Sequence, residues 1–333
     1  MRRGSYGVIT LKNDSDSTPV LIIGFSRCAS IRMQIEKLIS YGLSDIYLSL
    51  DYSTSPLVQR DQLDLIHYCN QRSRNTSTSI QIWQRKRNHG VGVGILSALE
   101  WFFSQNESGI VIEDDLIFDE NFVKFCKISL EKFRSCQEIL MISGNRYDGR
   151  ANGSEVVGTN YPQIWGWASW RSKWREIYRM ILRDSNFNLM QLNHPNKCFF
   201  YSGAMRARLG LLDTWDLPLA YEMLTQSKIC ILPPVNLVSN IGTDQYAVHT
   251  RQSAFPLNFP IEKLDNLVLP SLERIKASCE MQNIFLEKNV FRVKRRHHFS
   301  PFKLWVSLIY NKCLGREAHT LKARLKEAEK LES

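Results

Sequence analysis

A short apolar run that ends in three consecutive acids constrains the fold of this chain more than any other stretch. Residues 109–115 read Gly-Ile-Val-Ile-Glu-Asp-Asp. The β-branched side chains of Ile110, Val111 and Ile112 suit a buried strand of a mostly parallel sheet. In open α/β sheets, ligands bind just outside the carboxyl ends of the strands. The run therefore predicts an α/β fold with an acidic ligand site at one edge of its sheet.

The residues alone leave two interpretations of the three acids open. Adjacent carboxylates repel one another, so a bound cation lowers their free energy. Oxygen ligands suit Mg²⁺ or Mn²⁺, which also bind phosphates, so Glu113, Asp114 and Asp115 indicate a metal–diphosphate site. The alternative is a solvated acidic turn that caps the following helix.

Strands and helices alternate along the first half of the chain. A strand, a helix and a second strand within about thirty residues form a βαβ unit with parallel strands. Strands are predicted at residues 19–25, 45–51, 80–83, 109–112 and 139–144, and helices at 31–41, 55–72, 95–105 and 120–133.

A basic stretch, residues 85–87, leads into Gly90, Gly92 and Gly94. The glycine spacing is not that of a dinucleotide-binding fingerprint. It is compatible with backbone approaching a phosphate in front of the next helix, and equally with a flexible helix start.

The second half is rich in tryptophan. Trp165 and Trp167 flank Gly166, so one of them is a candidate to line a cleft where the flat face of a sugar can stack. For Trp170 and Trp174 we favour core packing of a helix on the sheet. Helices are predicted at residues 171–182, 201–215 and 216–226, and a late strand at 229–232.

The net charge of +10 is concentrated in the C-terminal residues 285–333, where 12 Lys and Arg stand against 5 Glu. Basic residues 293–298 precede an aromatic and aliphatic stretch, 299–314, and a mixed-charge helix at 317–332. This pattern fits an interfacial helix on an anionic membrane, and equally an ordinary helix packed on the body. Nucleic acid is not an expected partner, because the rest of the chain is nearly neutral.

The cysteines and the hydropathy indicate the compartment. The eight cysteines form no CxxC pair and no Cys/His cluster at zinc spacing, so we expect reduced thiols. We expect no signal peptide and no transmembrane helix, because no apolar run is long enough. A cytoplasmic protein, peripheral on the inner face of the plasma membrane, is the predicted location.

Taken in order, several segments resemble a bacterial group of nucleotide-diphospho-sugar transferases related to N-acetylglucosaminyltransferase I. The resemblance implies an α/β fold of glycosyltransferase A type, with a mostly parallel central sheet flanked by helices and a smaller acceptor-side half. The segments that carry it are residues 24–27, Asp51, residues 113–115, the Trp-Gly-Trp segment at 165–167, Trp215-Asp216 and residues 236–242.

The resemblance and the residue patterns together predict a division of the chain. The catalytic domain would span residues 18–260, with a nucleotide-sugar-binding half (18–150) and an acceptor half (151–260). A flexible N-terminus (1–17) would precede it, and a basic helical extension (261–333) would follow it.

The same resemblance implies roles for single residues. Asp115 would bind Mn²⁺ or Mg²⁺, which holds the donor diphosphate, and His249 in a closing loop would add a metal contact. The residues placed at the donor are Phe25, Arg27 at the nucleotide or diphosphate, Asp51 at the base N–H, and Glu113 and Asp114 at the sugar and ribose.

Asp216 would be the catalytic base, with Asp213 and Asp244 as rivals. From the residues alone, Asp216 is equally well interpreted as the cap of the helix that begins at Leu217. The implied reaction is metal-dependent transfer of a sugar from a UDP-sugar to a glycan or lipid-linked hydroxyl, with inversion.

Two alternatives of other classes stay open. One is a non-catalytic protein that binds nucleotide sugars or polysaccharide at the membrane surface. The other is a sugar-nucleotide nucleotidyltransferase, which would need a glycine-rich first loop, whereas residues 25–28 contain no glycine.

Overall fold

The computed structural model describes residues 18–148, 155–183, 195–242, 259–264, 267–313 and 320–332. The predicted flexible N-terminus (1–17), the metal contact His249 and the rival base Asp244 lie outside these residues.

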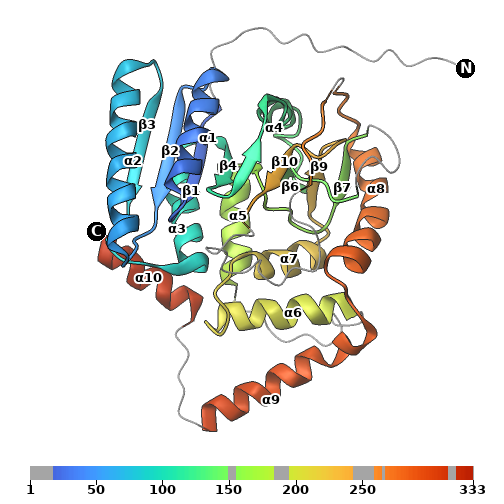
Figure 1. The fold of residues 1–333 in the computed structure, drawn as a ribbon. Helices are drawn as coiled ribbons and strands as arrows, with labels where there is room; N and C mark the ends of the chain where they lie inside the picture. The colour runs from blue at the N-terminus through green and yellow to red at the C-terminus, as the bar shows by residue number, and fades with distance from the viewer. Residues whose placement is uncertain are drawn as a thin grey trace, which may run out of the picture.

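An eight-stranded sheet forms the centre of the molecule, with strand order β3-β2-β1-β4-β8-β6-β9-β7 (Figure 1). A second, two-stranded sheet pairs β10 with β5. The strands are β1 (Val20–Gly24), β2 (Asp45–Leu50), β3 (Ser79–Gln84), β4 (Ser108–Glu113), β5 (Leu116–Phe118), β6 (Ile139–Ser143), β7 (Val157–Thr159), β8 (Trp167–Trp170), β9 (Ile229–Leu232) and β10 (Val238–Asn240).

Helices cover both faces of this sheet. The α-helices of the described residues are α1 (Cys28–Ser40), α2 (Pro56–Asn75), α3 (Gly90–Gln105), α4 (Glu120–Lys132), α5 (Arg171–Leu182), α6 (Pro195–Arg208), α7 (Asp216–Thr225), α8 (Leu272–Phe285), α9 (Ser300–Cys313) and α10 (Leu321–Glu332). One apolar core joins the sheet to α1, α2, α4 and α8, and a second joins its other face to α3, α5, α7 and α10.

The mostly parallel sheet confirms the predicted α/β class. β3, β2, β1 and β4 run parallel, and β9 runs parallel to β6. β8 is antiparallel to both β4 and β6, and sequence reasoning did not predict it. All four of its residues are buried, so it lacks the alternation that distinguishes a half-exposed strand from core-packed tryptophans.

The strand register places several predicted site residues at one edge of the sheet. Gly24 of β1 lies opposite Leu50 of β2, and Ile23 lies opposite Glu113 of β4. The three strands therefore end side by side. Phe25, Asp51 and Asp114 follow directly in the chain and emerge together at the carboxyl edge.

Several predicted helix bounds are wrong, and two of them bear on the site. α3 begins at Gly90 rather than residue 95, so the glycines belong to the helix. α6 ends at Arg208 rather than residue 215. The chain then returns through residues 209–215 to the start of α3, where the Asp213 side chain accepts hydrogen bonds from Val91 N and Gly92 N.

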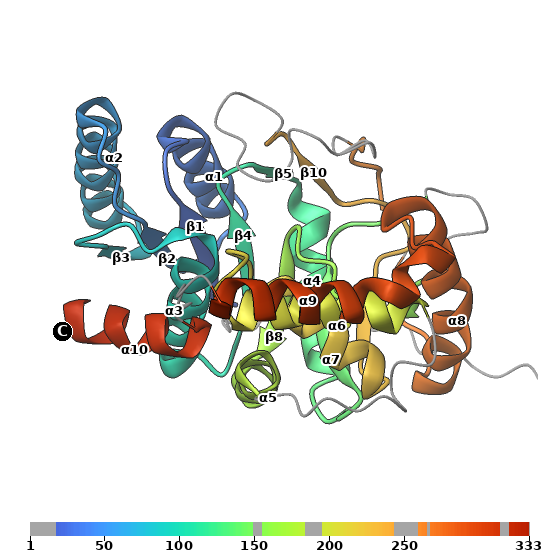
Figure 2. The same cartoon turned by 90° about the horizontal axis from the view of Figure 1, so that it is seen from below.

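The C-terminal extension is helical, as expected, and much of it is built into the body. α8 packs on β7 and buries Ile275 and Cys279, while α10 lies against α3. α9 crosses the bottom of the molecule away from the sheet (Figures 1 and 2). Among the described residues, no helix combines the length and apolar character needed to cross a bilayer.

The core position of Trp167 predicts its effect on stability. Replacing Trp167 with alanine should cost about 3–5 kcal/mol of unfolding free energy, because the side chain is 2% exposed and stacks on Trp215. Urea unfolding measures the cost. Trp305, which is 59% exposed on α9, is the matched control, and its alanine variant should stay within about 0.5 kcal/mol of wild type. Equal losses in the two variants would contradict the assignment.

Candidate functional site

A cavity of about 590 Å³ opens at the carboxyl edge of β1, β2 and β4, where α3 and α7 begin. It contains most of the side chains singled out from the sequence. They are Phe25, Arg27, Asp51, Glu113, Asp114, Asp115, Trp165 and Asp216. Residues from five separate segments of the chain therefore meet in one place.

Asp114 holds the turn between β1 and α1. Its buried carboxylate accepts hydrogen bonds from Phe25 N at 2.9 Å and Arg27 N at 3.5 Å. The Arg27 guanidinium pairs with the same carboxylate at 3.1 Å. These contacts are charge-assisted and mostly shielded from water, so they fix the rim of the cavity. The donor contact expected of Asp114 stays a prediction, and its observed partners belong to the protein itself.

Glu113 and Asp115 lie on either side of Asp114 and face the cavity. Burial, followed by the charge of Asp114, raises the pKa of Asp115 to about 6, although Arg27 and a hydrogen bond from Asn240 oppose the shift. Burial and then the charges of Asp115, Asp114 and Asp216 raise the pKa of Glu113 as well. Arg27 thus offsets several carboxylates at this rim of the cavity, and the rim favours additional positive charge.

The donor set fits a metal ion that is shared with a ligand. Within the described ranges, no three His, Cys, Asp or Glu side chains are grouped to hold an ion by themselves. Asp115 lines the cavity and is the acid at which the resemblance places the metal. Mg²⁺ and Mn²⁺ sites commonly combine one or two carboxylates with phosphate oxygens, which this arrangement allows.

Asp51 lines the cavity at the end of β2, on the other side of β1 from the acids of β4. Its carboxylate accepts hydrogen bonds from Tyr52 N at 2.9 Å and from His89 N at 3.1 Å. Burial raises the pKa of Asp51, and these two N–H donors limit the shift. Gln62 Nε2 bridges the main-chain oxygens of Asp51 and Phe25 at 2.9 and 2.7 Å, which ties the ends of β1 and β2 together.

Arg85 lines the cavity, although from the sequence it was named only as part of a basic stretch and given no role. It is 3% exposed, lies 3.4 Å over the Trp83 ring, and donates to Ser97 Oγ at 2.9 Å. Burial lowers its pKa to about 10, although Asp51 and Glu332 oppose the shift. The sequence signal for Arg85 was its position just after the strand predicted at 80–83, since Asp51 follows the preceding strand in the same way.

Asp213 and Asp216 have different surroundings. Asp213 accepts from Val91 N and Gly92 N at 2.8 and 3.1 Å, so a carboxylate already occupies the N-terminus of α3. The phosphate contact considered for these glycines is therefore disfavoured, because the Asp213 carboxylate already accepts hydrogen bonds at this helix N-terminus. Asp216 is the first residue of α7, one place after the cap position, and its side chain accepts a hydrogen bond from Thr214 Oγ1.

The two tryptophans around Gly166 point in different directions. Gly166, which lies between them, has φ +63°, a conformation that L side chains rarely adopt. Trp165 is partly buried, lines the cavity and contacts Tyr147 edge-on. Trp167 is buried in β8 against Trp215, so its predicted sugar-stacking role is wrong.

Comparisons with known proteins add little to this geometry. No family model matches the chain, and no curated protein matches it. Among solved structures it is similar to HddC from Yersinia pseudotuberculosis, at 13% identity and a TM-score of 0.29 over 51% of this chain and 80% of that one. The structure of HddC complexed with GMP-PN gives the same identity and TM-score over 50% of this chain and 80% of that one. Similarity at this level supports no inference about function.

The raised pKa of Asp115 predicts a pH-dependent stability. A carboxyl whose pKa is higher in the folded state binds protons preferentially there, so folding is penalised as pH rises from about 4 to 6. Asp115→Asn removes this penalty. It should stabilise the protein at pH 7 by on the order of 1–2 kcal/mol, allowing for partial solvent screening, and by little near pH 4.

Urea unfolding of the metal-free protein at several pH values measures this difference. Asp64→Asn, an exposed acid on α2, is the control and should show no such trend. A stabilisation by Asp115→Asn that does not change with pH would contradict the account.

Proposed function

We propose that this protein is a metal-dependent glycosyltransferase that moves a sugar from a UDP-sugar to a hydroxyl of a glycan or lipid-linked acceptor. One observation carries the proposal. A single cavity joins a strand-end acid suited to a shared metal, Asp115, with a separate carboxylate on a helix, Asp216. Such transfer needs one group to stabilise the leaving diphosphate and another to accept a proton.

The donor is proposed to lie along the carboxyl edge of the sheet. Asp51 and Arg85 lie at the end suited to the base, where the carboxylate can accept from a ring N–H and the guanidinium can donate. Phe25 and Arg27 lie at the β1–α1 turn, between that end and the acids. Glu113 and Asp114 are assigned to the sugar and ribose.

Asp115 is proposed to hold a Mn²⁺ or Mg²⁺ ion together with the donor diphosphate. When bound, such an ion supplies positive charge where the leaving group becomes more negative. Arg27 can add to this charge, since it lies at the same rim. The further contact assigned to His249 lies outside the described residues.

Asp216 is proposed to be the general base. The acceptor oxygen forms a bond to the anomeric carbon while the bond from that carbon to the diphosphate oxygen breaks. The hydroxyl proton passes to the Asp216 carboxylate, and the leaving nucleoside diphosphate takes the electron pair of the broken bond. Attack from the face opposite the leaving group inverts the anomeric configuration. Asp213 is the weaker candidate, because its carboxylate caps α3.

α9 is proposed to bring the enzyme to an anionic membrane where a lipid-linked acceptor would lie. Phe302, Trp305, Val306 and Ile309 recur at helical spacing and are 63, 59, 46 and 44% exposed. Exposed basic residues, Lys294, Arg295, Arg296 and Lys303, lie in or just before the same helix. An apolar helix face bordered by basic side chains fits the interface of an anionic bilayer. A cytoplasmic location at the inner face of the plasma membrane remains part of this proposal.

Asp216→Asn separates the chemical step from binding. The variant should bind donor as wild type does, because the amide keeps the shape of the carboxylate, but it cannot take up the proton. Turnover should therefore fall by about 10²–10⁴-fold. Single-turnover kinetics and calorimetric titration with a UDP-sugar and Mn²⁺ measure the two quantities. Asp64→Asn, far from the cavity on α2, should change neither, and loss of donor binding in Asp216→Asn would refute the assigned role.

The membrane contact makes a separate prediction. A Phe302→Ala/Trp305→Ala variant should sediment with phosphatidylserine vesicles at least about tenfold less than wild type, because two buried aromatic anchors are lost. The matched control is Leu57→Ala/Leu63→Ala, which removes two exposed apolar side chains from α2 and should bind as wild type does. Equal binding of wild type and both variants to phosphatidylserine vesicles would contradict the membrane contact. Equal binding of wild type to neutral and to phosphatidylserine vesicles would contradict its dependence on anionic lipid.

A further inference from the structure

Residues 86–92, here called the 86–92 turn, comprise the turn after β3 and the first residues of α3, and they form one wall of the cavity. Asn88, Gly90 and Val91 line the cavity directly. Inside the wall, His89 N donates to both carboxylate oxygens of Asp51, at 3.1 and 3.2 Å. Gly90 has φ +72°, and a Cβ there would lie 2.4 Å from Asp213 Oδ2, so the backbone passes very close to the cap of α3. The path of this turn therefore determines the shape of the cavity around Asp51.

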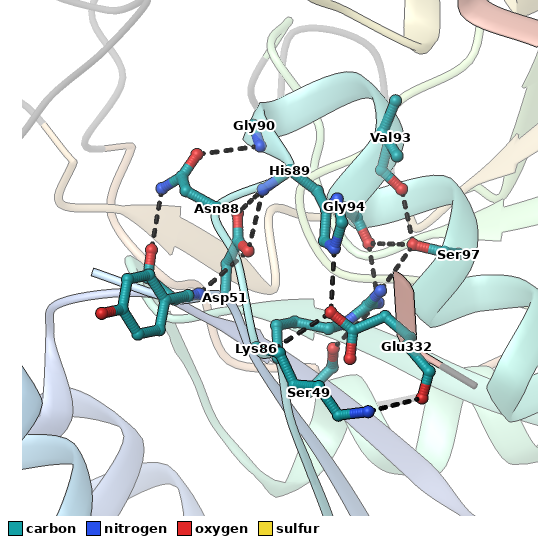
Figure 3. A network of polar contacts seen from close by, with 12 residues as sticks. Ser49, Asp51, Lys86, Asn88, His89, Gly90, Val93, Gly94, Ser97 and Glu332 are labelled. Carbon is teal, nitrogen blue, oxygen red and sulfur yellow. Dashed lines mark hydrogen bonds and ion pairs between the residues drawn. The ribbon is translucent and has the colours of Figure 1, made fainter. Parts of the chain in front are cut away.

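α10 holds the same turn from outside, as Figure 3 shows for Glu332. Glu332 Oε1 lies 2.9 Å from His89 Nε2 and accepts a hydrogen bond from Lys86 N at 3.1 Å. Lys86 Nζ donates to the main-chain oxygen of Glu332 at 3.3 Å. The His89 and Glu332 side chains are only 8% and 7% exposed. This contact is therefore shielded from the solvent screening that weakens surface pairs.

Arg324 holds the other end of the turn, about two helical turns before Glu332. Its guanidinium lies 3.3 Å from Asp213 Oδ1 and donates to the main-chain oxygen of His89 at 3.3 Å. Asp213 in turn accepts from Val91 N and Gly92 N. Arg324 thus joins the turn to the residue that caps α3.

Apolar burial fixes α10 in this position. Leu321, Leu325 and Ala328 are 2, 3 and 3% exposed and belong to the same core as α3. Their spacing places them on one face of the helix. The polar contacts of α10 with the turn are therefore separate from its apolar contacts with the core. Arg324 and Glu332 can be replaced without removing the apolar contacts.

We propose that α10 is a component of the donor site, in which Arg324 and Glu332 are positioning residues that hold the 86–92 turn against Asp51 and Asp213. The nature of the ligand rests on the proposed function, whereas the hold on the turn does not. Loss of the two side chains loosens the cavity wall around Asp51. Binding of the nucleotide weakens as a result, while the step assigned to Asp216 on α7 keeps its rate once donor is bound.

The test uses the full chain and UDP with Mn²⁺ as the probe. Arg324→Ala/Glu332→Ala should weaken UDP binding by about tenfold, or ~1.4 kcal/mol. Glu332→Gln, which keeps an oxygen that can accept from Lys86 N, should bind UDP much more tightly than the double variant and close to wild type. Lys326→Ala, an exposed residue of α10, is the matched control and should bind as wild type does. For transfer, KM for the donor should rise and kcat should stay within about twofold.

Hydrogen exchange of the ligand-free protein provides a second readout. The amides of Val91 and Gly92 should exchange faster in the double variant and unchanged in Lys326→Ala, with the remaining sheet amides as an internal control. If the double variant does not fold, the single variants Arg324→Gln and Glu332→Ala replace it.

The two measurements separate failure of this inference from failure of the proposed function. If wild type binds UDP and the double variant binds within twofold of it, the role of α10 is refuted. If wild type binds no nucleoside diphosphate, the proposed function fails, and unchanged exchange of Val91 and Gly92 would then refute the hold on the turn as well.

Discussion

The site depends first on the hydrogen bonds that the Asp114 carboxylate accepts from the β1–α1 turn. Phe25 N and the Arg27 guanidinium approach it at 2.9 and 3.1 Å, so the end of β4 and the end of β1 share one rim. Without these bonds a buried carboxylate would lie between two others with no compensation for its lost hydration. The turn and the acidic triplet therefore stabilise each other, and the cavity forms where they meet.

The remaining carboxylates of the cavity are distinguished by their surroundings. Asp51 accepts backbone N–H groups, and Asp213 caps α3 and contacts Arg324. Asp115 lies at the acidic rim with a raised pKa, and Asp216 lines the same cavity at the start of α7. Burial and partners thus distinguish acids of one residue type, and the proposed function assigns them to a structural cap, a metal ligand and a proton acceptor.

Local patterns allowed the α/β class and the parallel strands around β1 to be predicted. Most of the candidate site residues were instead named from the resemblance, and those in the described part of the chain, apart from Trp167, line the cavity. The β-branched run before Glu113 and the acids that directly follow β2 and β4 are local signals. β8 could not be predicted, because its pairing with β4 and β6 is non-local and both of its faces are buried. The sequence did not distinguish Trp165 from Trp167 as the residue that lines the cleft, because the left-handed conformation of Gly166 between them leaves no mark in the hydrophobic pattern. The contacts of Arg324 and Glu332 were hidden for a further reason, since up to 246 residues separate the partners.

Metal-dependent release of UDP from a UDP-sugar tests the central claim most directly. The account predicts that wild type releases UDP from one or more members of a UDP-sugar panel when Mn²⁺ is present, and releases none when the metal is chelated. Asp115→Ala should remain folded and release none in either condition. Undiminished release by Asp115→Ala, or release that continues after chelation, would contradict the account.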